Sequence, residues 1–105
     1  MQVTVNQQPR PELELEPQQV MLLELVGRKA LQKRHIASLI VNLYNSNRVG
    51  ADMYNLMPYL RGEPNDDLRN GIFALLEISA YCESHEIYGV DFVRHLIDNW
   101  FSDDD

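Results

Sequence analysis

Residues 36–43 read IASLIVNL, and this stretch carries the clearest helical pattern in the chain. Ile36, Leu39, Ile40 and Leu43 recur at the i, i+3, i+4, i+7 spacing that places apolar side chains on one face of an α-helix. We expect this helix to run to about residue 45. Because a helix with one apolar face must bury it against another element, the stretch predicts helical neighbours in the same core.

The same periodicity recurs on both sides of this stretch. Pro17 suits the first position of an earlier helix, and Gly27 either lies inside that helix, at a cost of about 1 kcal/mol relative to alanine, or ends it. Pro58 predicts a kinked or 3₁₀ end for a helix that begins near residue 50. The apolar positions of the later helices are Val49, Met53, Leu56, Met57 and Leu60; then Leu68, Ile72, Leu75, Leu76 and Ser79, on a helix ending near Ser84; and finally Val93, Leu96, Ile97 and Trp100, after a break at Tyr88 and Gly89.

These patterns predict an all-α domain, a small bundle of four to five amphipathic helices formed by residues 18–102. Residues 1–17 have a different pattern, because valines and leucines alternate with polar residues around a Pro-Arg-Pro turn. We expect this segment to be an extended or disordered arm. Residues 103–105 form an acidic tail that we expect to fray, because three aspartates are unfavourable at the negative end of a helix dipole.

Composition places the chain among ordinary globular proteins of one domain, with 105 residues, 45% hydrophobic and 24% charged. Cys82 is the only cysteine, so no disulfide framework is possible within the chain. No apolar stretch approaches the ~20 residues that a membrane-spanning helix needs, and the first ten residues lack the features of a secretory signal. We therefore expect a cytoplasmic protein without a membrane association.

The charge is unevenly distributed along the chain. The formal net charge is -7 and the pI is about 4.8. Residues 21–48 nevertheless contain five basic residues and one acidic residue, whereas residues 49–105 contain three basic and twelve acidic residues. An acidic protein binds phosphate backbones poorly, so nucleic acid is not an expected partner. A polarised charge distribution instead favours steering toward a protein partner, in which we assign a part to Glu83, Glu86 and Asp98.

Four side chains near the end of the sequence have the chemistry and spacing of metal ligands: Cys82, His85, Asp91 and His95. Helix geometry places Cys82 on the apolar side of its helix and Asp91 with His95 on the polar side of theirs. Because these directions diverge, we expect no metal and no other cofactor. A metal-binding domain that uses His85, Asp91 and His95 stays an alternative hypothesis.

A second alternative is a small DNA-binding regulator that uses the basic segment 28–48. Its basic residues are Arg28, Lys29, Lys33, Arg34 and Arg48. The outline around residues 46–50 resembles a helix-turn-helix. However, the segment in the position of the recognition helix, residues 50–60, carries Asp52 and no basic residue that would read base edges.

Aromatic and methionine side chains in and beside the predicted stripes are the strongest functional signal, because they exceed what a core of this size requires. Tyr, Trp and Met are typical of protein interfaces. We expect the contact residues to be Met53, Tyr54, Met57, Tyr59, Trp100 and Phe101. The sequence, which carries no catalytic motif, therefore predicts a non-enzymatic protein-binding module, such as an adaptor, an inhibitor or a chaperone-like cofactor. Its partner is another protein or a second copy in a homodimer.

Overall fold

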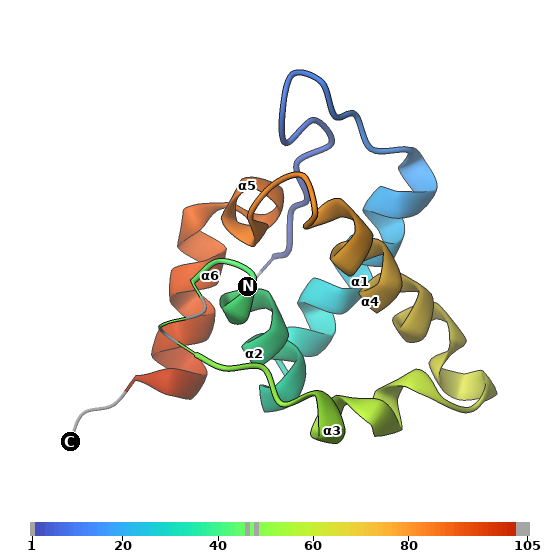
Figure 1. The fold of residues 1–105 in the computed structure, drawn as a ribbon, viewed down its shortest axis with the longest axis vertical. Coiled ribbons are helices and arrows are strands. Elements are labelled where there is room, and N and C mark those ends of the chain that lie inside the picture. The colour runs from blue at the N-terminus through green and yellow to red at the C-terminus, as the bar shows by residue number, and fades with distance from the viewer. Residues whose placement is uncertain (1, 46, 48, 103–105) are drawn as a thin grey trace.

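The chain is built of consecutive helices in the computed structural model, which describes residues 2–45, 47 and 49–102 (Figure 1). The α-helices are α1 (Pro17–Ala30), α2 (Arg34–Asn42), α3 (Met53–Leu56), α4 (Asp66–Ile78), α5 (Ser84–Tyr88) and α6 (Val90–Leu96). The 3₁₀-helices η1 (Met57–Leu60) and η2 (Glu63–Asn65) connect α3 to α4, and α6 continues into the π-helical turn η3 (Ile97–Phe101). The described residues form no β-strand, which confirms the predicted all-α class. None of the helices they form has the length and apolar character needed to cross a bilayer.

The first helix begins where the sequence predicts. Pro17 occupies the first helical position, and the Gln19 side chain accepts a hydrogen bond of 2.8 Å from the Glu16 backbone N–H. Gly27 continues the helix, which ends at Ala30. The close approach of the N-terminal arm explains a glycine here, because a Cβ at residue 27 would lie 2.6 Å from Cγ1 of Val3.

Helix α2 ends earlier than predicted, at Asn42, and the chain then turns instead of continuing to residue 45. The backbone N–H groups of Tyr44 and Asn45 both donate to the carbonyl of Val41, which closes this turn. The Asn42 side chain donates 3.0 Å to the Val49 carbonyl and so holds the start of the next segment. Most of the predicted loop at residues 46–48 lies outside the described residues.

The segment before α4 has the 3₁₀ end that Pro58 predicts. Asp52 caps α3, since its Oδ1 accepts a hydrogen bond of 3.2 Å from the Asn55 backbone N–H. The helix is α-helical only over Met53–Leu56, and it continues as the 3₁₀ turn η1, which contains Pro58.

The helix predicted to end near Ser84 is shorter, and this expectation was wrong. Helix α4 ends at Ile78, and a separate helix, α5, begins at Ser84. Two hydrogen bonds to α2 and its end explain the new start, because the buried Ser84 hydroxyl donates 2.6 Å to the Ile40 carbonyl and the Ser84 N–H donates 3.3 Å to the Leu43 carbonyl. The predicted break after α5 is confirmed, since Gly89 adopts a φ of 89° that favours glycine.

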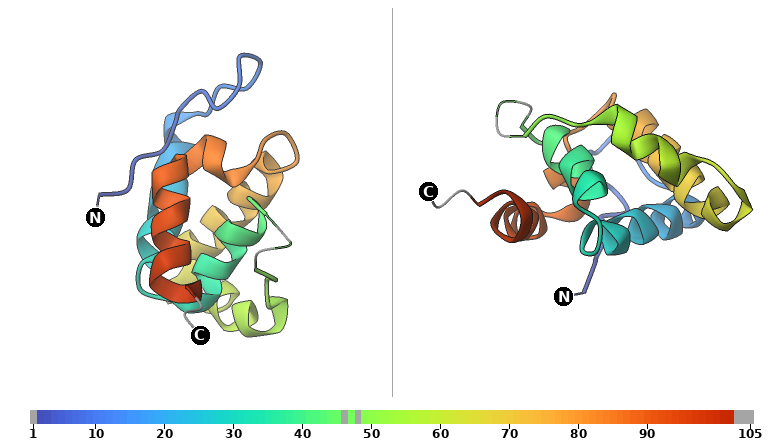
Figure 2. Two further views of the ribbon diagram at one scale, coloured as in Figure 1. Left: turned by 90° about the vertical axis from the view of Figure 1, so that its left-hand side faces the viewer. Right: turned by 90° about the horizontal axis from the view of Figure 1, so that it is seen from below.

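One core joins the apolar faces of the helices. Helix α1 packs against α2 and α4, and α2 packs against α6, as the views in Figure 2 also show. Leu39, Leu75 and Leu96, from three different helices, are at most 2% exposed and belong to the same cluster. Leu76 is an exception to the predicted stripe, because 38% of its surface is exposed. It lies about 100° from Leu75 around the helix axis, which turns it away from the core.

The N-terminal arm is extended and lies against the bundle, so the disordered alternative does not hold for residues 2–16 (Figure 1). Val5 and Leu15 are buried in the core, with 8% and 1% exposure. The Asn6 backbone N–H donates 2.8 Å to the Ile87 carbonyl. Residues 2–16, which we call the strap, therefore fasten the start of the chain to α5.

Candidate functional site

The short helix α3 and the start of η1 present three large apolar side chains to the solvent. Tyr54 is 84% exposed, Met53 is 44% exposed and Met57 is 43% exposed. Leu56, the last residue of the same helix, is completely buried and anchors it to the core. The Asp52 cap and the Leu56 anchor hold these three side chains outward, and we call Met53, Tyr54 and Met57 the Met–Tyr face.

The other three predicted contact residues are half-buried. Tyr59 packs against the core from η1. Trp100 and Phe101 belong to the π-helical turn η3, where the Trp100 indole N–H donates 3.0 Å to the Ala30 carbonyl. The Phe101 ring lies beneath the Arg34 guanidinium, whose carbon is 4.8 Å from the ring centroid. These aromatic groups therefore have structural partners as well as an exposed part.

A surface groove of about 630 Å³ lies between the first turns of α2, the segment before α3, and η3. Its lining residues are Arg34, His35, Ser38, Val49, Gly50, Asp52, Trp100, Phe101 and Ser102. Asp52 directly precedes the Met–Tyr face, while Trp100 and Phe101 form part of the groove. The fold thus brings predicted contact residues that are more than forty positions apart in the sequence to neighbouring parts of one surface.

Two charged residues of this groove are held by hydrogen bonds. The hydrogen bonds from Asn55 to Asp52 lower the pKa of the Asp52 carboxyl. The Arg34 guanidinium donates 2.8 Å to the Trp100 carbonyl through Nη1. Arg34 is therefore oriented by η3 through both this hydrogen bond and the Phe101 ring. π-Helical turns are rare in proteins and occur frequently at functional sites, so the position of η3 in the wall of the groove supports the groove as a candidate site.

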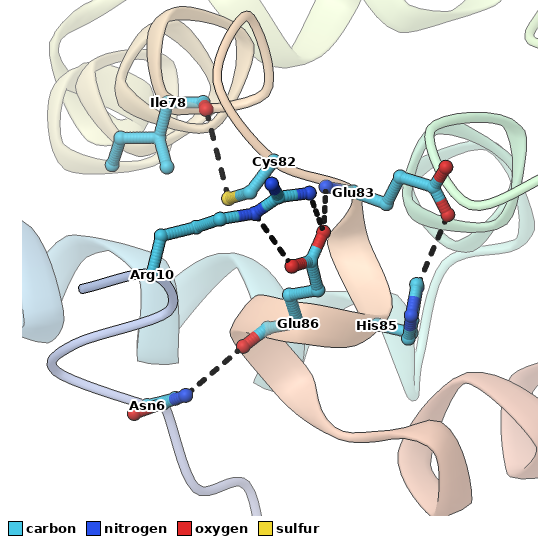
Figure 3. A network of polar contacts seen from close by, with 7 residues as sticks. All are labelled: Asn6, Arg10, Ile78, Cys82, Glu83, His85 and Glu86. Carbon is cyan, nitrogen blue, oxygen red and sulfur yellow. Dashed lines mark hydrogen bonds and ion pairs between the residues drawn. The ribbon is translucent and has the colours of Figure 1, made fainter. Parts of the chain in front are cut away.

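The three residues assigned to charge steering have different surroundings. Glu86 accepts two hydrogen bonds from Arg10, at 2.8 and 3.0 Å, and these lower the pKa of its carboxyl (Figure 3). Its charge is therefore matched within the chain and fastens the strap to α5. Glu83 lies 3.3 Å from Nδ1 of His85, and Asp98 is exposed on η3. Of the three, Asp98 is the one for which the described residues supply no ion-pair partner.

The alternative metal ligands do not come together. His85 packs edge-on against Tyr44, and Asp91 is exposed on α6. The part of the chain that the structure describes holds no group of three or more His, Cys, Asp or Glu side chains with the proximity of a metal site. Cys82 is 5% exposed, and burial raises the pKa of its thiol. The predicted burial holds, but the helix from which it was inferred ends at Ile78, so Cys82 lies in the connection to α5. Its Sγ lies 3.8 Å from the Ile78 carbonyl (Figure 3).

Other exposed apolar side chains were not assigned a contact role by the sequence. Phe73 and Leu76 lie one turn apart on α4 and are 52% and 38% exposed, while Met21 and Tyr81 are 62% and 68% exposed. Helical phase signals Phe73, since it lies well outside the arc of Leu68, Ile72 and Leu75. Tyr81 follows the end of α4 in a turn, where helical periodicity carries no information.

Comparison of the chain with protein-family models, with curated proteins and with solved structures finds no significant match.

Proposed function

We propose that this protein is a non-enzymatic protein-binding module that contacts its partner through the Met–Tyr face. The observation that carries the proposal is the exposure of Met53, Tyr54 and Met57 around the fully buried Leu56. Burying these side chains against a partner removes apolar surface from water, which is the main favourable term in most protein associations. Adaptors, inhibitors and chaperone-like cofactors all act through faces of this kind.

The chemistry of the face supports this role. Tyrosine provides a large apolar ring with a polar tip and loses little conformational entropy on binding. Methionine is flexible and polarizable, so Met53 and Met57 adapt to the shape of a partner. The cap at Asp52 and the buried Leu56 hold the backbone of the face in place before binding, which reduces the entropic cost of association.

Tyr54→Ala tests the proposal, with Tyr81→Ala as a matched control. Both tyrosines are mostly exposed, at 84% and 68%, so both substitutions remove a similar side chain at little expected cost in stability. Tagged versions of the two variants and the wild type are used for affinity capture in native host cells, followed by quantitative mass spectrometry. We expect Tyr54→Ala to lose proteins that the wild type and Tyr81→Ala retain, and light scattering to show whether a second copy is among them.

The binding constant gives a second readout once a captured protein is purified. Truncation of a central interface tyrosine weakens binding by at least tenfold in typical hot spots. We expect a loss of this size for Tyr54→Ala and less than about threefold for Tyr81→Ala, because rim and non-interface residues contribute little. Identical capture by both variants contradicts the Met–Tyr face as the binding surface.

A further inference from the structure

A concentration of unmatched positive charge lies beside the groove. Arg28 and Lys29 form the last turn of α1, Lys33 lies in the connection, and Arg34 begins α2. We call these four residues the basic corner. The Arg34 contacts with η3 place this residue in the wall of the groove, and Lys33 directly precedes it in the chain. Arg28 lines a separate hollow that also contains Asp67.

The basic corner has no acidic counterpart within the described residues. The ion pairs found among the described residues join Arg10 to Glu86 and Arg69 to Asp66, and the Glu83 carboxylate lies beside the His85 imidazole. None of them involves the basic corner. Glu24, which lies four residues before Arg28, is not within ion-pair distance of it. The corner is thus positive on a protein whose formal net charge is -7, and it is available to an external negative group.

The guanidinium of Arg34 is already oriented to bind a negatively charged group. Its Nη1 donates to the Trp100 carbonyl and its guanidinium lies over the Phe101 ring, so its orientation is fixed while it lines the groove. A guanidinium has five N–H donors in a planar arrangement that matches a carboxylate. One of these donors has a partner among the described residues, and the others are free to bind a ligand. The aromatic and aliphatic lining from Val49, Trp100 and Phe101 suits apolar side chains next to that carboxylate.

We propose that the groove binds an acidic peptide segment of a partner protein, with a carboxylate on Arg34 and a further acidic residue beside Lys33. This inference rests on the proposed function, because it names the chemistry of the partner that the Met–Tyr face contacts. The size of the basic corner favours a short acidic segment over a nucleic acid. A longer polyanion would extend beyond the corner onto a surface dominated by acidic residues, where it is repelled.

A fluorescein-labelled acidic peptide with a central Leu and Phe is the direct probe. Its anisotropy is measured with the purified wild-type protein at low and high salt, beside a peptide in which every Asp and Glu is replaced by Asn and Gln. We expect the acidic peptide to bind more tightly and to weaken as salt screens the charges. Equal binding of both peptides overturns the inference. Tighter binding of a single-stranded DNA of equal charge also overturns it.

Charge variants locate the binding site. The double variant Lys33→Glu/Arg34→Glu is compared with Arg61→Glu/Arg94→Glu, which makes the same change of net charge at exposed positions outside the groove lining. We expect the first to weaken binding by about tenfold and the second by less than about threefold, from typical energies of exposed ion pairs and their screening. An equal effect of the two double variants shows a merely global charge effect and overturns the site.

Two further variants test the groove itself. Asp52→Asn keeps a side chain that caps α3 but removes the negative charge from the groove, so we expect it to tighten binding by about two- to threefold. Substitution of all three aspartates at residues 103–105 by asparagine tests whether the chain's own tail is the occupant. If the protein binds the acidic peptide only after this substitution, its own tail is the occupant of the groove, and the assignment to a partner is overturned.

The two proposals fail separately. Tyr54→Ala is expected to leave the affinity for the isolated acidic peptide within about twofold, since the peptide is bound by charge in the groove. If the acidic peptide does not bind while Tyr54→Ala still loses captured proteins, the acidic-segment inference is wrong and the Met–Tyr face stands. If the peptide binds and Tyr54→Ala loses nothing, the groove alone is the binding site.

Discussion

The substitution Gly71→Ala measures how closely α1 and α4 approach each other. A Cβ at residue 71 would lie 2.7 Å from Cγ2 of Val26 and 2.8 Å from the backbone carbonyl oxygen of Leu22. The valine methyl can rotate, but the carbonyl belongs to the α1 backbone and cannot move without the helix. The two helices must therefore separate by a few tenths of an ångström, which disturbs the packing on both sides of the contact.

The expected size of the effect follows from two opposing contributions. Overpacking costs about 1–3 kcal/mol, and a clash with helix backbone belongs to the upper part of that range, about 2–3 kcal/mol, whereas alanine in a helix interior is about 1 kcal/mol more favourable than glycine. The net expectation is a loss of about 1–2 kcal/mol of the free energy of unfolding, which for a domain of this size lowers the melting temperature by roughly 5–10 °C. Thermal and urea unfolding followed by far-UV circular dichroism measure both quantities.

Two other glycines provide controls for this reasoning. Gly50 has open space around its Cβ position, so Gly50→Ala should leave the stability unchanged or slightly higher. At Gly27 the nearest atom is Cγ1 of Val3, a side chain of the strap that can shift, so Gly27→Ala should cost less than Gly71→Ala. A Gly71→Ala variant as stable as the wild type would refute the close helix contact.

Three further predictions concern the polar contacts of the fold. Tyr88→Phe removes the hydroxyl that donates a hydrogen bond of 2.8 Å to the buried Leu23 carbonyl. Urea unfolding should show that the free energy of unfolding falls by about 1–2 kcal/mol. The pKa of the Glu86 carboxyl is lowered in the folded state, so on acidification the unfolded chain binds a proton at this residue before the folded protein does. The free energy of unfolding therefore falls as the pH drops below the ordinary glutamate pKa of 4.5. Thermal unfolding of Glu86→Gln should show a smaller loss of stability over the same pH range. Arg10→Ala releases the ion pair that fastens the strap near Cys82, so a thiol reagent should label Cys82 faster than in the wild type, and equal labelling rates would contradict this role.

Helical periodicity predicted the elements that have one buried face. The spacing of Ile36, Leu39 and Ile40 led to α2, and the backbone restriction of Pro58 led to the 3₁₀ end. The break at Gly89 was also predicted, and it coincides with a φ of 89° that glycine adopts easily. The separation of α4 from α5 was not predictable in this way. The Ser84 hydrogen bonds to the carbonyls of Ile40 and Leu43 are long-range contacts. The capping box of Glu83 and Glu86 at the start of α5 is a local signal, but the apolar pattern does not include it.

The candidate site shows the same division between local and long-range information. Residue type led to Met53, Tyr54 and Met57 as contact candidates, but helical phase placed Met53 and Met57 on one stripe with Leu56. That stripe prediction was wrong for the two methionines, which are 44% and 43% exposed, because α3 is a single short turn and Met57 already belongs to η1. The groove was not predictable, since it exists only where the beginning of α2 meets η3. The basic residues were noticed in the sequence, but their proximity to Trp100 and Phe101 required the fold.

The strap has a consequence for the order in which the molecule is assembled during translation. Asn6 is made before Glu86, which lies 80 positions later and whose carbonyl accepts a hydrogen bond from the Asn6 side chain. At synthesis rates of about 5–20 residues per second, the strap waits roughly 4–16 s for its binding site on α5 to be made. During that interval Val5 and Leu15 are without their final neighbours, so docking of the strap is a late step that closes a structure already formed by the helices.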